Sequence, residues 1–391
     1  MTRNFETSEA LKRLPEQFFA KLVKKVQSLA NEGHDIINLG QGNPDQPTPQ
    51  HIVDKLKQAA DNPNYHKYSP FRGQSFLKEA VCDFYKREYN VDLDPETEVT
   101  ILFGAKTGLV EISQCLLNNG DVALLPDPGY PDYLSGMAMS HAKIETMPLT
   151  QEHDFLPDYG DIDAATLDKA KLMFLNYPNN PTAGVATSSF FDETVEIAKK
   201  HHICVVHDFA YGALGFDGEK PPSFLASEGA KDIGVEMYTL SKTFNMAGWR
   251  IAFAVGNPSV IESLNLIQDH MYVSIFGAIQ EAAAHALQEP EEAIETIRET
   301  YEKRRDAFMT AIYAIGWKAE APKGSFFAWL PIPNGFTSEE FADLLLEKAH
   351  VVVAPGNGFG EYGEGYIRVG LLTEESRLLE AVKRIEKLAL F

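Results

Sequence analysis

Side chains able to bind a small molecule follow four short apolar runs in the middle of the sequence, each at the point where the run ends. Such runs are typical of buried strands, and ligands of open α/β sheets bind at the carboxyl ends of the strands. The groups are a glycine and a lysine that open a helix, an asparagine, a carboxylate with a phenol, and a primary amine. The residues are Gly104, Ala105, Lys106, Asn180, Asp208, Tyr211, Ser241 and Lys242.

This combination of groups fits pyridoxal phosphate. That cofactor needs a lysine for a Schiff base, an acid at its ring nitrogen, hydrogen bonds to its phenolic oxygen and a cup for its phosphate. Gly104, Ala105 and Lys106 open a helix, whose free N–H groups and positive dipole end attract anions. Each feature is weak alone, and together they predict a pyridoxal phosphate site.

The apolar runs alternate with helical patterns, which indicates how these groups are positioned. Such alternation predicts crossover connections, a mostly parallel sheet covered on both faces by helices, and therefore an α/β fold. The predicted helices include 108–117 and 189–201. The predicted strands are 99–103, 122–125, 171–175, 203–207, 236–240 and 251–255.

A second region is expected from about residue 290. Pro290 and the two glutamates after it favour a helix start, and an amphipathic pattern continues to about Ala314. Further strands are predicted at 325–330, 351–354 and 366–370, with a helix at 339–348 and a closing helix. Because chain termini often pack together, we expect a small domain of 1–45 and 290–391 beside a large domain of 46–289.

Composition excludes several classes of partner. Among 391 residues, 35 are basic and 56 acidic, so the formal net charge of −21 disfavours nucleic acids and anionic membranes. The three cysteines form no CxxC pair, which argues against a disulfide framework or a zinc site and for a reducing compartment. Neither a signal peptide nor an apolar run of about 20 residues is present, so a cytoplasmic location is expected.

With these motifs in place, the sequence resembles the class I/II aminotransferases of the fold-type I pyridoxal phosphate superfamily. The strongest marker is 239–250, where Lys242 and Arg250 stand eight residues apart as in the family's Ser-x-Ser-Lys…Gly-x-Arg signature. Asn180, Asp208 with Tyr211, and Arg368 support it. The resemblance covers nearly the whole chain and implies a seven-stranded large domain with a smaller α+β domain.

The resemblance assigns the central roles. Lys242 is expected to hold the cofactor and to move the proton between the substrate Cα and the cofactor C4′, and Asp208 to pair with the ring nitrogen. Asn180 and Tyr211 are expected at the phenolic oxygen. Arg368 is expected to bind the substrate α-carboxylate together with Asn180 and the backbone around Gly40.

Other residues are assigned to the rest of the cofactor. Ala105 and Lys106, with Gly104 at the helix start, are expected at the phosphate, joined by Thr239, Ser241 and Arg250. Tyr130 is expected to stack on the cofactor ring. Tyr68 matches a tyrosine that in relatives reaches the phosphate of the neighbouring subunit, which implies a homodimer.

Overall similarity favours transamination between an amino acid and a 2-oxo acid, without a metal. The unassigned arginines lie mostly in helical, charge-rich stretches, which favours a substrate with a neutral or apolar side chain. Segments 38–47 and 207–212 look most like methionine-salvage aminotransferases, which act on 4-methylthio-2-oxobutyrate.

Other functions stay open at this point. They are an aspartate or LL-diaminopimelate aminotransferase, a C–S β-lyase, and the effector-binding domain of a transcription regulator. The last is disfavoured by the acidic charge and by the short segment before residue 38, which leaves little room for a DNA-binding region.

Overall fold

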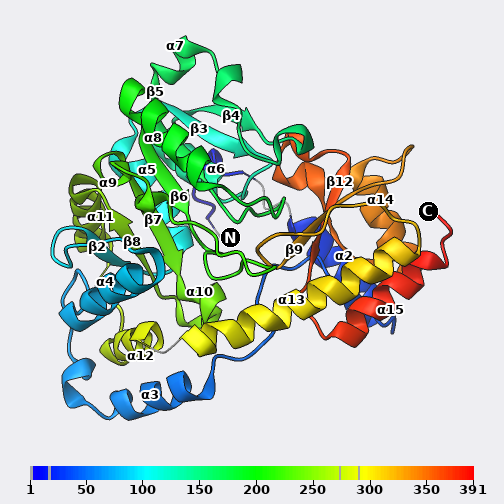
Figure 1. The fold of residues 1–391 in the computed structure, drawn as a ribbon, viewed down its shortest axis with the longest axis horizontal. Coiled ribbons are helices and arrows are strands. Elements are labelled where there is room, and N and C mark those ends of the chain that lie inside the picture. The colour runs from blue at the N-terminus through cyan, green and yellow to red at the C-terminus, as the bar shows by residue number, and fades with distance from the viewer. Residues whose placement is uncertain (1–2, 16–18, 273, 289–290) are drawn as a thin grey trace.

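The centre of the fold is a seven-stranded sheet with the order β2-β8-β7-β6-β5-β3-β4 (Figure 1). The computed structural model describes residues 3–15, 19–272, 274–288 and 291–391. Strand β8 is antiparallel to both neighbours and the other pairs are parallel, so the predicted mostly parallel sheet is confirmed. The strands are β2 (Val99–Leu102), β3 (Val122–Asp127), β4 (Lys143–Pro148), β5 (Ala170–Leu175), β6 (Cys204–Asp208), β7 (Gly234–Thr239) and β8 (Ala252–Gly256).

Helices cover both faces of this sheet because successive side chains of its strands point to opposite faces and both sets are apolar. Met237 and Tyr238 of β7 thus belong to different clusters, one with α5, α6 and α11 and the other with α4, α8 and α12. No helix among the described residues is long and apolar enough to cross a bilayer. The helices are α3 (Gln50–Ala60), α4 (Ser75–Tyr89), α5 (Ala105–Leu116), α6 (Tyr133–Ser140), α7 (Ala164–Leu167), α8 (Ser188–His201), α9 (Ala230–Ile233), α10 (Leu240–Thr243), α11 (Pro258–Met271) and α12 (Gly277–Gln288).

Strand β4 is the one member of this sheet that the sequence pattern did not predict. It is an edge strand, and its first four residues, which include Lys143 and Glu145, are exposed. Charged side chains on an edge strand oppose pairing with another chain. They also remove the continuous apolar pattern by which the buried strands were found.

A second hydrophobic core lies around a three-stranded antiparallel sheet, β11-β12-β9, and a parallel pair, β1-β10. The single strand predicted at 351–354 is two strands, because the chain leaves one sheet and joins the other at Val353. Pro290 lies outside the described residues. The elements are β1 (Ile37–Asn38), α13 (Glu291–Ala314), β9 (Phe327–Pro331), α14 (Ser338–Leu344) with a π-helical turn (Leu345–Ala349), β10 (Val351–Val352), β11 (Ala354–Pro355), β12 (Tyr366–Gly370) and α15 (Glu375–Glu386).

The N-terminal segment contributes to this second core. Ile37 and Leu39 are buried in it, and Leu39 O accepts a hydrogen bond from Gly370 N at 2.6 Å. Helices α1 (Glu9–Lys12) and α2 (Phe19–Asn31) precede this segment. We therefore propose the division into a large domain, 46–289, and a small domain, 1–45 with 290–391. Arg13, after α1, also reaches the large domain, where its Nε donates to Ala138 O at 3.0 Å.

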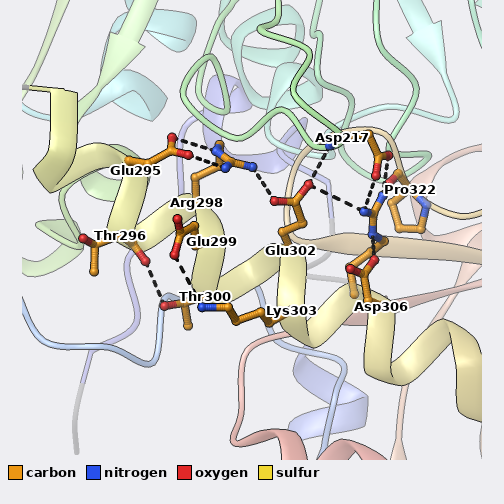
Figure 2. A network of polar contacts seen from close by, with 11 residues as sticks. Asp217, Glu295, Thr296, Arg298, Glu299, Thr300, Glu302, Lys303, Asp306 and Pro322 are labelled. Carbon is orange, nitrogen blue, oxygen red and sulfur yellow. Dashed lines mark hydrogen bonds and ion pairs between the residues drawn. The ribbon is translucent and has the colours of Figure 1, made fainter.

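Helix α13 connects the two regions and carries a network of ion pairs along one side (Figure 2). Arg305 is buried and donates to both carboxylate oxygens of Asp217, at 2.8 and 2.7 Å, and to Pro322 O at 3.0 Å. Glu302 accepts the backbone N–H of Asp217 at 2.6 Å. Because Asp217 lies in the loop after β6, these bonds fix α13 against the large domain.

Replacing this arginine is expected to destabilise the protein. Arg305→Ala removes a bidentate ion pair and leaves Pro322 O without that donor, so the free energy of unfolding should fall by about 2 kcal/mol. The matched control is Lys303→Ala, because Lys303 pairs with Glu299 on the exposed side of the same helix and should contribute less than about 0.5 kcal/mol. Urea denaturation measures both, and equal effects would contradict the expectation.

Candidate active site

A cavity of about 720 Å³ brings together residues that lie far apart in the sequence. It opens where β5, β6 and β7 end, and the small-domain residues Phe327, Val352 and Arg368 complete its wall. Of the residues predicted to form the site, only Gly104 and Tyr68 do not line it. The lining residues that were predicted are Gly40, Ala105, Lys106, Tyr130, Asn180, Asp208, Tyr211, Thr239, Ser241, Lys242, Arg250 and Arg368.

Lys242 lies on the one-turn helix α10, directly after β7. The Thr239 side chain caps this turn by accepting a hydrogen bond from Ser241 N at 3.2 Å. The Lys242 Nζ donates to Gly42 O at 2.8 Å. Burial and then the positive charge of Arg368 lower the pKa of Lys242 to about 8. A substantial fraction of this amine is therefore neutral, and hence nucleophilic, near pH 8.

Asp208 ends strand β6, and one of its two carboxylate oxygens accepts a hydrogen bond from a side chain. Tyr133 donates its hydroxyl to Asp208 Oδ2 at 2.9 Å, while Oδ1 is buried and has no hydrogen-bond partner among the described residues. Burial raises the pKa of Asp208 to about 6, so the group is ionised at neutral pH. A buried, charged oxygen without a donor is costly unless a ligand supplies one. The geometry favours a cationic or N–H group of a ligand at this position.

Asn176 joins the ends of two neighbouring strands. Its side-chain Nδ2 donates to Asp208 O at 2.7 Å, and its Oδ1 accepts the backbone N–H of Asn180 at 2.8 Å. Asn180 Oδ1 in turn accepts a hydrogen bond from Arg368 at 2.7 Å. The position of Asn180 is thus set from both sides, by the strand end and by the small domain.

Two of these residues were missed by the sequence analysis. Tyr133 comes three residues after Tyr130, and Asn176 is the first residue after the apolar run 171–175. The position of Asn176 at a strand end was a usable signal. The partner of Tyr133 was not, because only the folded sheet brings α6 beside the end of β6.

Arg368 is almost completely buried, on strand β12. Its guanidinium donates to Gly40 O at 2.9 Å and lies over two rings, 4.1 Å from the centre of Phe327 and 4.7 Å from that of Phe359. Burial lowers the pKa of Arg368 to about 10, which leaves it charged at neutral pH. A buried guanidinium fixed in this way is chemically suited to bind a carboxylate.

A second set of donors surrounds the start of helix α5. Gly104 has a φ of +87°, and a Cβ there would lie 2.2 Å from Arg250 Nη2, so the close approach of Arg250 requires glycine. Thr239 donates its hydroxyl to Ser241 Oγ at 2.9 Å. Lys106 pairs with Asp132 at 2.8 Å. Helix N–H groups, hydroxyls and an arginine gathered in this way form a candidate anion site.

The predicted tyrosines have different positions. Tyr130 and Tyr211 line the cavity, and burial raises the pKa of each phenol above its ordinary value. The Tyr130 ring lies edge-on to Tyr133 at 5.6 Å. Tyr68 is 89% exposed and does not line the cavity of its own chain.

The mixed seven-stranded sheet and the lysine, carboxylate and anion site at its strand ends define a fold-type I enzyme. The structure is similar to substrate-bound BacF from Bacillus subtilis, with a TM-score of 0.95 and 52% identity over 99% of this chain and 98% of that one. It is also similar to a single mutant of Thermus thermophilus aspartate aminotransferase, with a TM-score of 0.91 and 27% identity over 98% and 100%.

The family follows from the sequence comparison. The profile of the family described as aminotransferase class I and II matches residues 34–385. The chain is 65% identical, over 99% of its length and 97% of the relative's, to L-glutamine--4-(methylsulfanyl)-2-oxobutanoate aminotransferase of Bacillus subtilis strain 168. It therefore belongs to the class I and II aminotransferases and is a pyridoxal phosphate-dependent transaminase, as the sequence motifs predicted.

The lowered pKa of Lys242 predicts a pH dependence for covalent attachment of pyridoxal phosphate to the apoenzyme. Only the neutral amine attacks the aldehyde, so the attachment rate should rise with pH and level off above about pH 8. Arg368→Ala removes a charge that lowers this pKa, and should move the midpoint to higher pH. Rates are followed by absorbance.

The control variant is Arg377→Ala, which removes an arginine that pairs with Asp35 and does not line the cavity. It should leave the midpoint unchanged. A wild-type rate that keeps rising toward pH 10.5, the ordinary lysine value, would contradict the expectation.

Proposed function

We propose that this enzyme transfers the amino group of glutamine to 4-methylthio-2-oxobutanoate, which yields methionine. The observation that carries the proposal is the 65% identity, over nearly the full length of both chains, to a Bacillus subtilis protein whose name states that activity. The chain is less similar, at 44% identity, to an LL-diaminopimelate aminotransferase of Moorella thermoacetica. Aspartate or LL-diaminopimelate transamination and C–S β-lysis are the alternatives.

The charges of the cavity support a substrate with a neutral side chain. Among its described lining residues, Arg250 and Arg368 are the arginines. Because Arg250 lies at the anion site beside Gly104, Arg368 remains for the substrate α-carboxylate. A distal carboxylate would then lack an arginine partner. Apolar walls for a methylthio or methylene side chain are available from Val23, Val26, Leu109, Phe327 and Val352.

The residues present fit pyridoxal phosphate. The unpartnered Oδ1 of Asp208 suits a protonated ring nitrogen, and the Lys242 amine suits the aldehyde carbon. Asn180 and Tyr211 would bind the phenolic oxygen, and Tyr130 would contact the ring. The phosphate would be held by the residues around the start of α5: Gly104, Ala105, Lys106, Thr239, Ser241 and Arg250.

When bound, pyridoxal phosphate supplies the electron sink that allows the Cα–H bond of an amino acid to break. Lys242 takes up this proton, a task that suits an amine with a pKa near 8. Arg368, Asn180 and the Gly40 carbonyl region orient the substrate through its α-carboxylate. Asp208 keeps the negative charge that a protonated ring needs, because Tyr133 donates a hydrogen bond to it.

A panel of 2-oxo acids with glutamine as donor tests the substrate. Wild-type enzyme should use 4-methylthio-2-oxobutanoate with a kcat/KM at least about tenfold above that for oxaloacetate, because the distal carboxylate of oxaloacetate would be desolvated without a partner. Products are quantified by chromatography. Lys242→Ala, which should neither hold the cofactor nor react, is the blank. Preference for oxaloacetate would overturn the proposed substrate.

We also propose that the enzyme works as a homodimer in which Tyr68 reaches the phosphate of the partner subunit. Tyr68 and Phe71 are exposed, and Arg72 in the same loop pairs with Glu262 and Asp269 of α11. Leu266 and Met271 of that helix are also exposed. An exposed apolar surface of this kind is typical of an interface.

Sedimentation should therefore report a dimer, and Tyr68→Phe should weaken the binding of pyridoxal phosphate about tenfold through the loss of a hydrogen bond to a charged group. Tyr313→Phe, a half-exposed tyrosine of α13, is the matched control and should have no effect. A monomer with full activity, or unchanged cofactor affinity in Tyr68→Phe, would contradict this proposal.

A further inference from the structure

Asp127 ends strand β3 of the large domain, and its buried carboxylate binds the small domain. Oδ1 accepts the backbone N–H of Tyr362 at 3.0 Å, and Oδ2 accepts that of Glu361 at 3.2 Å. Burial raises the pKa of Asp127, and no arginine, lysine or histidine forms an ion pair with it among the described residues. The carboxylate oxygens therefore find their hydrogen-bond donors in the N–H groups of a loop more than 200 residues away.

The same loop makes a third hydrogen bond, two residues beyond Asp127. Gly129 N donates to Phe359 O at 2.8 Å. Between these bonds, Gly360 allows the close approach, because its φ is +141° and a Cβ there would lie 2.0 Å from Asp127 Oδ1. With any other residue, a Cβ at position 360 would force the loop or the Asp127 carboxylate to shift, and so would disturb their contact.

On both sides of this contact, the residues adjoin side chains that line the cavity. On the large-domain side, Tyr130 follows Gly129. On the small-domain side, the Phe359 ring packs against the Arg368 guanidinium and edge-on against Trp329 at 6.1 Å. The position of Phe359 therefore limits where the Arg368 side chain can lie.

We propose that Asp127 is a positioning residue, which holds the loop 359–362 on the turn that carries Tyr130 and so keeps Arg368 in place for the substrate carboxylate. This inference rests on the proposed role of Arg368. It assigns to Asp127 no contact with substrate or cofactor, and it explains why a carboxylate is buried at a strand end outside the cavity lining.

The test combines two variants that break the contact from opposite sides. Asp127→Asn replaces one acceptor oxygen by an amide that faces an N–H group, and Gly360→Ala places a methyl group against the carboxylate. Amide hydrogen exchange of segment 359–363 should become about tenfold faster in each variant. The KM for 4-methylthio-2-oxobutanoate should rise about tenfold, and kcat and the affinity for pyridoxal phosphate should change less than about twofold.

A binding measurement gives a readout apart from turnover. The probe is 4-(methylthio)butanoate, a carboxylate that cannot be transaminated, titrated into the holoenzyme. Its Kd should rise in both variants. Because the two substitutions break the same contact, the Kd of the double variant should not exceed the higher of the two single-variant values. A double variant whose Kd rises by the product of the two single-variant fold increases would overturn the proposal.

Two substitutions serve as matched controls. Asp121→Asn removes a carboxylate directly before β3 that accepts, among the described residues, hydrogen bonds from Asn118 in its own turn. Gly365→Ala strains a glycine with a φ of +90° and no described atom within 4 Å of its Cβ position. Both should bind the probe as the wild type does.

The variant Arg368→Ala separates the role of Asp127 from the role of Arg368. If it weakens the probe but Asp127→Asn and Gly360→Ala do not, the role of Asp127 is wrong. If Arg368→Ala itself binds the probe normally, the proposed role of Arg368 fails, and with it the coupling to substrate.

Discussion

The burial of one guanidinium, that of Arg368, constrains much of this structure. A buried cation must be surrounded by acceptors and polarisable groups, and here these come from distant parts of the chain: the Gly40 carbonyl, the Asn180 side chain, and the rings of Phe327 and Phe359. The N-terminal segment, the large sheet and the small sheet must therefore all be in place before the charge is tolerated. Its field also lowers the pKa of Lys242, which increases the neutral fraction of that amine.

The candidate site carries an excess of positive groups, although the molecule as a whole is acidic. The chain has a formal net charge of −21, yet Lys106, Lys242, Arg250 and Arg368 line one cavity together with the start of α5. Net charge describes the solvated exterior, where the acidic excess favours solubility. An anionic ligand in this cavity would instead meet fixed, partly desolvated positive groups at short range, where local arrangement outweighs the total charge.

Local sequence patterns predicted much of the fold and of the candidate site, and each feature that they missed has a physical cause. Buried strands were found because they are continuously apolar, and β4 was not because its exposed edge carries charges. The run 351–354 was interpreted as one strand because a change of sheet at Val353 leaves no mark on residue type. Tyr133 was missed because its partner, Asp208, is 75 residues away and only the stacking of α6 on the sheet joins them.

Residue type and order were sufficient for the α/β class, for the cofactor of the family and for most of the cavity-lining residues. Each of these depends on short-range features: apolar runs, a helix start, and a lysine, acid or arginine at a characteristic spacing. Packing decided which oxygen of Asp208 is left for a ligand, how far the pKa of Lys242 falls, and that Asp127 binds the loop of Phe359. These properties depend on desolvation and on distances between atoms of separate elements, which exist only once the two hydrophobic cores have brought the elements together.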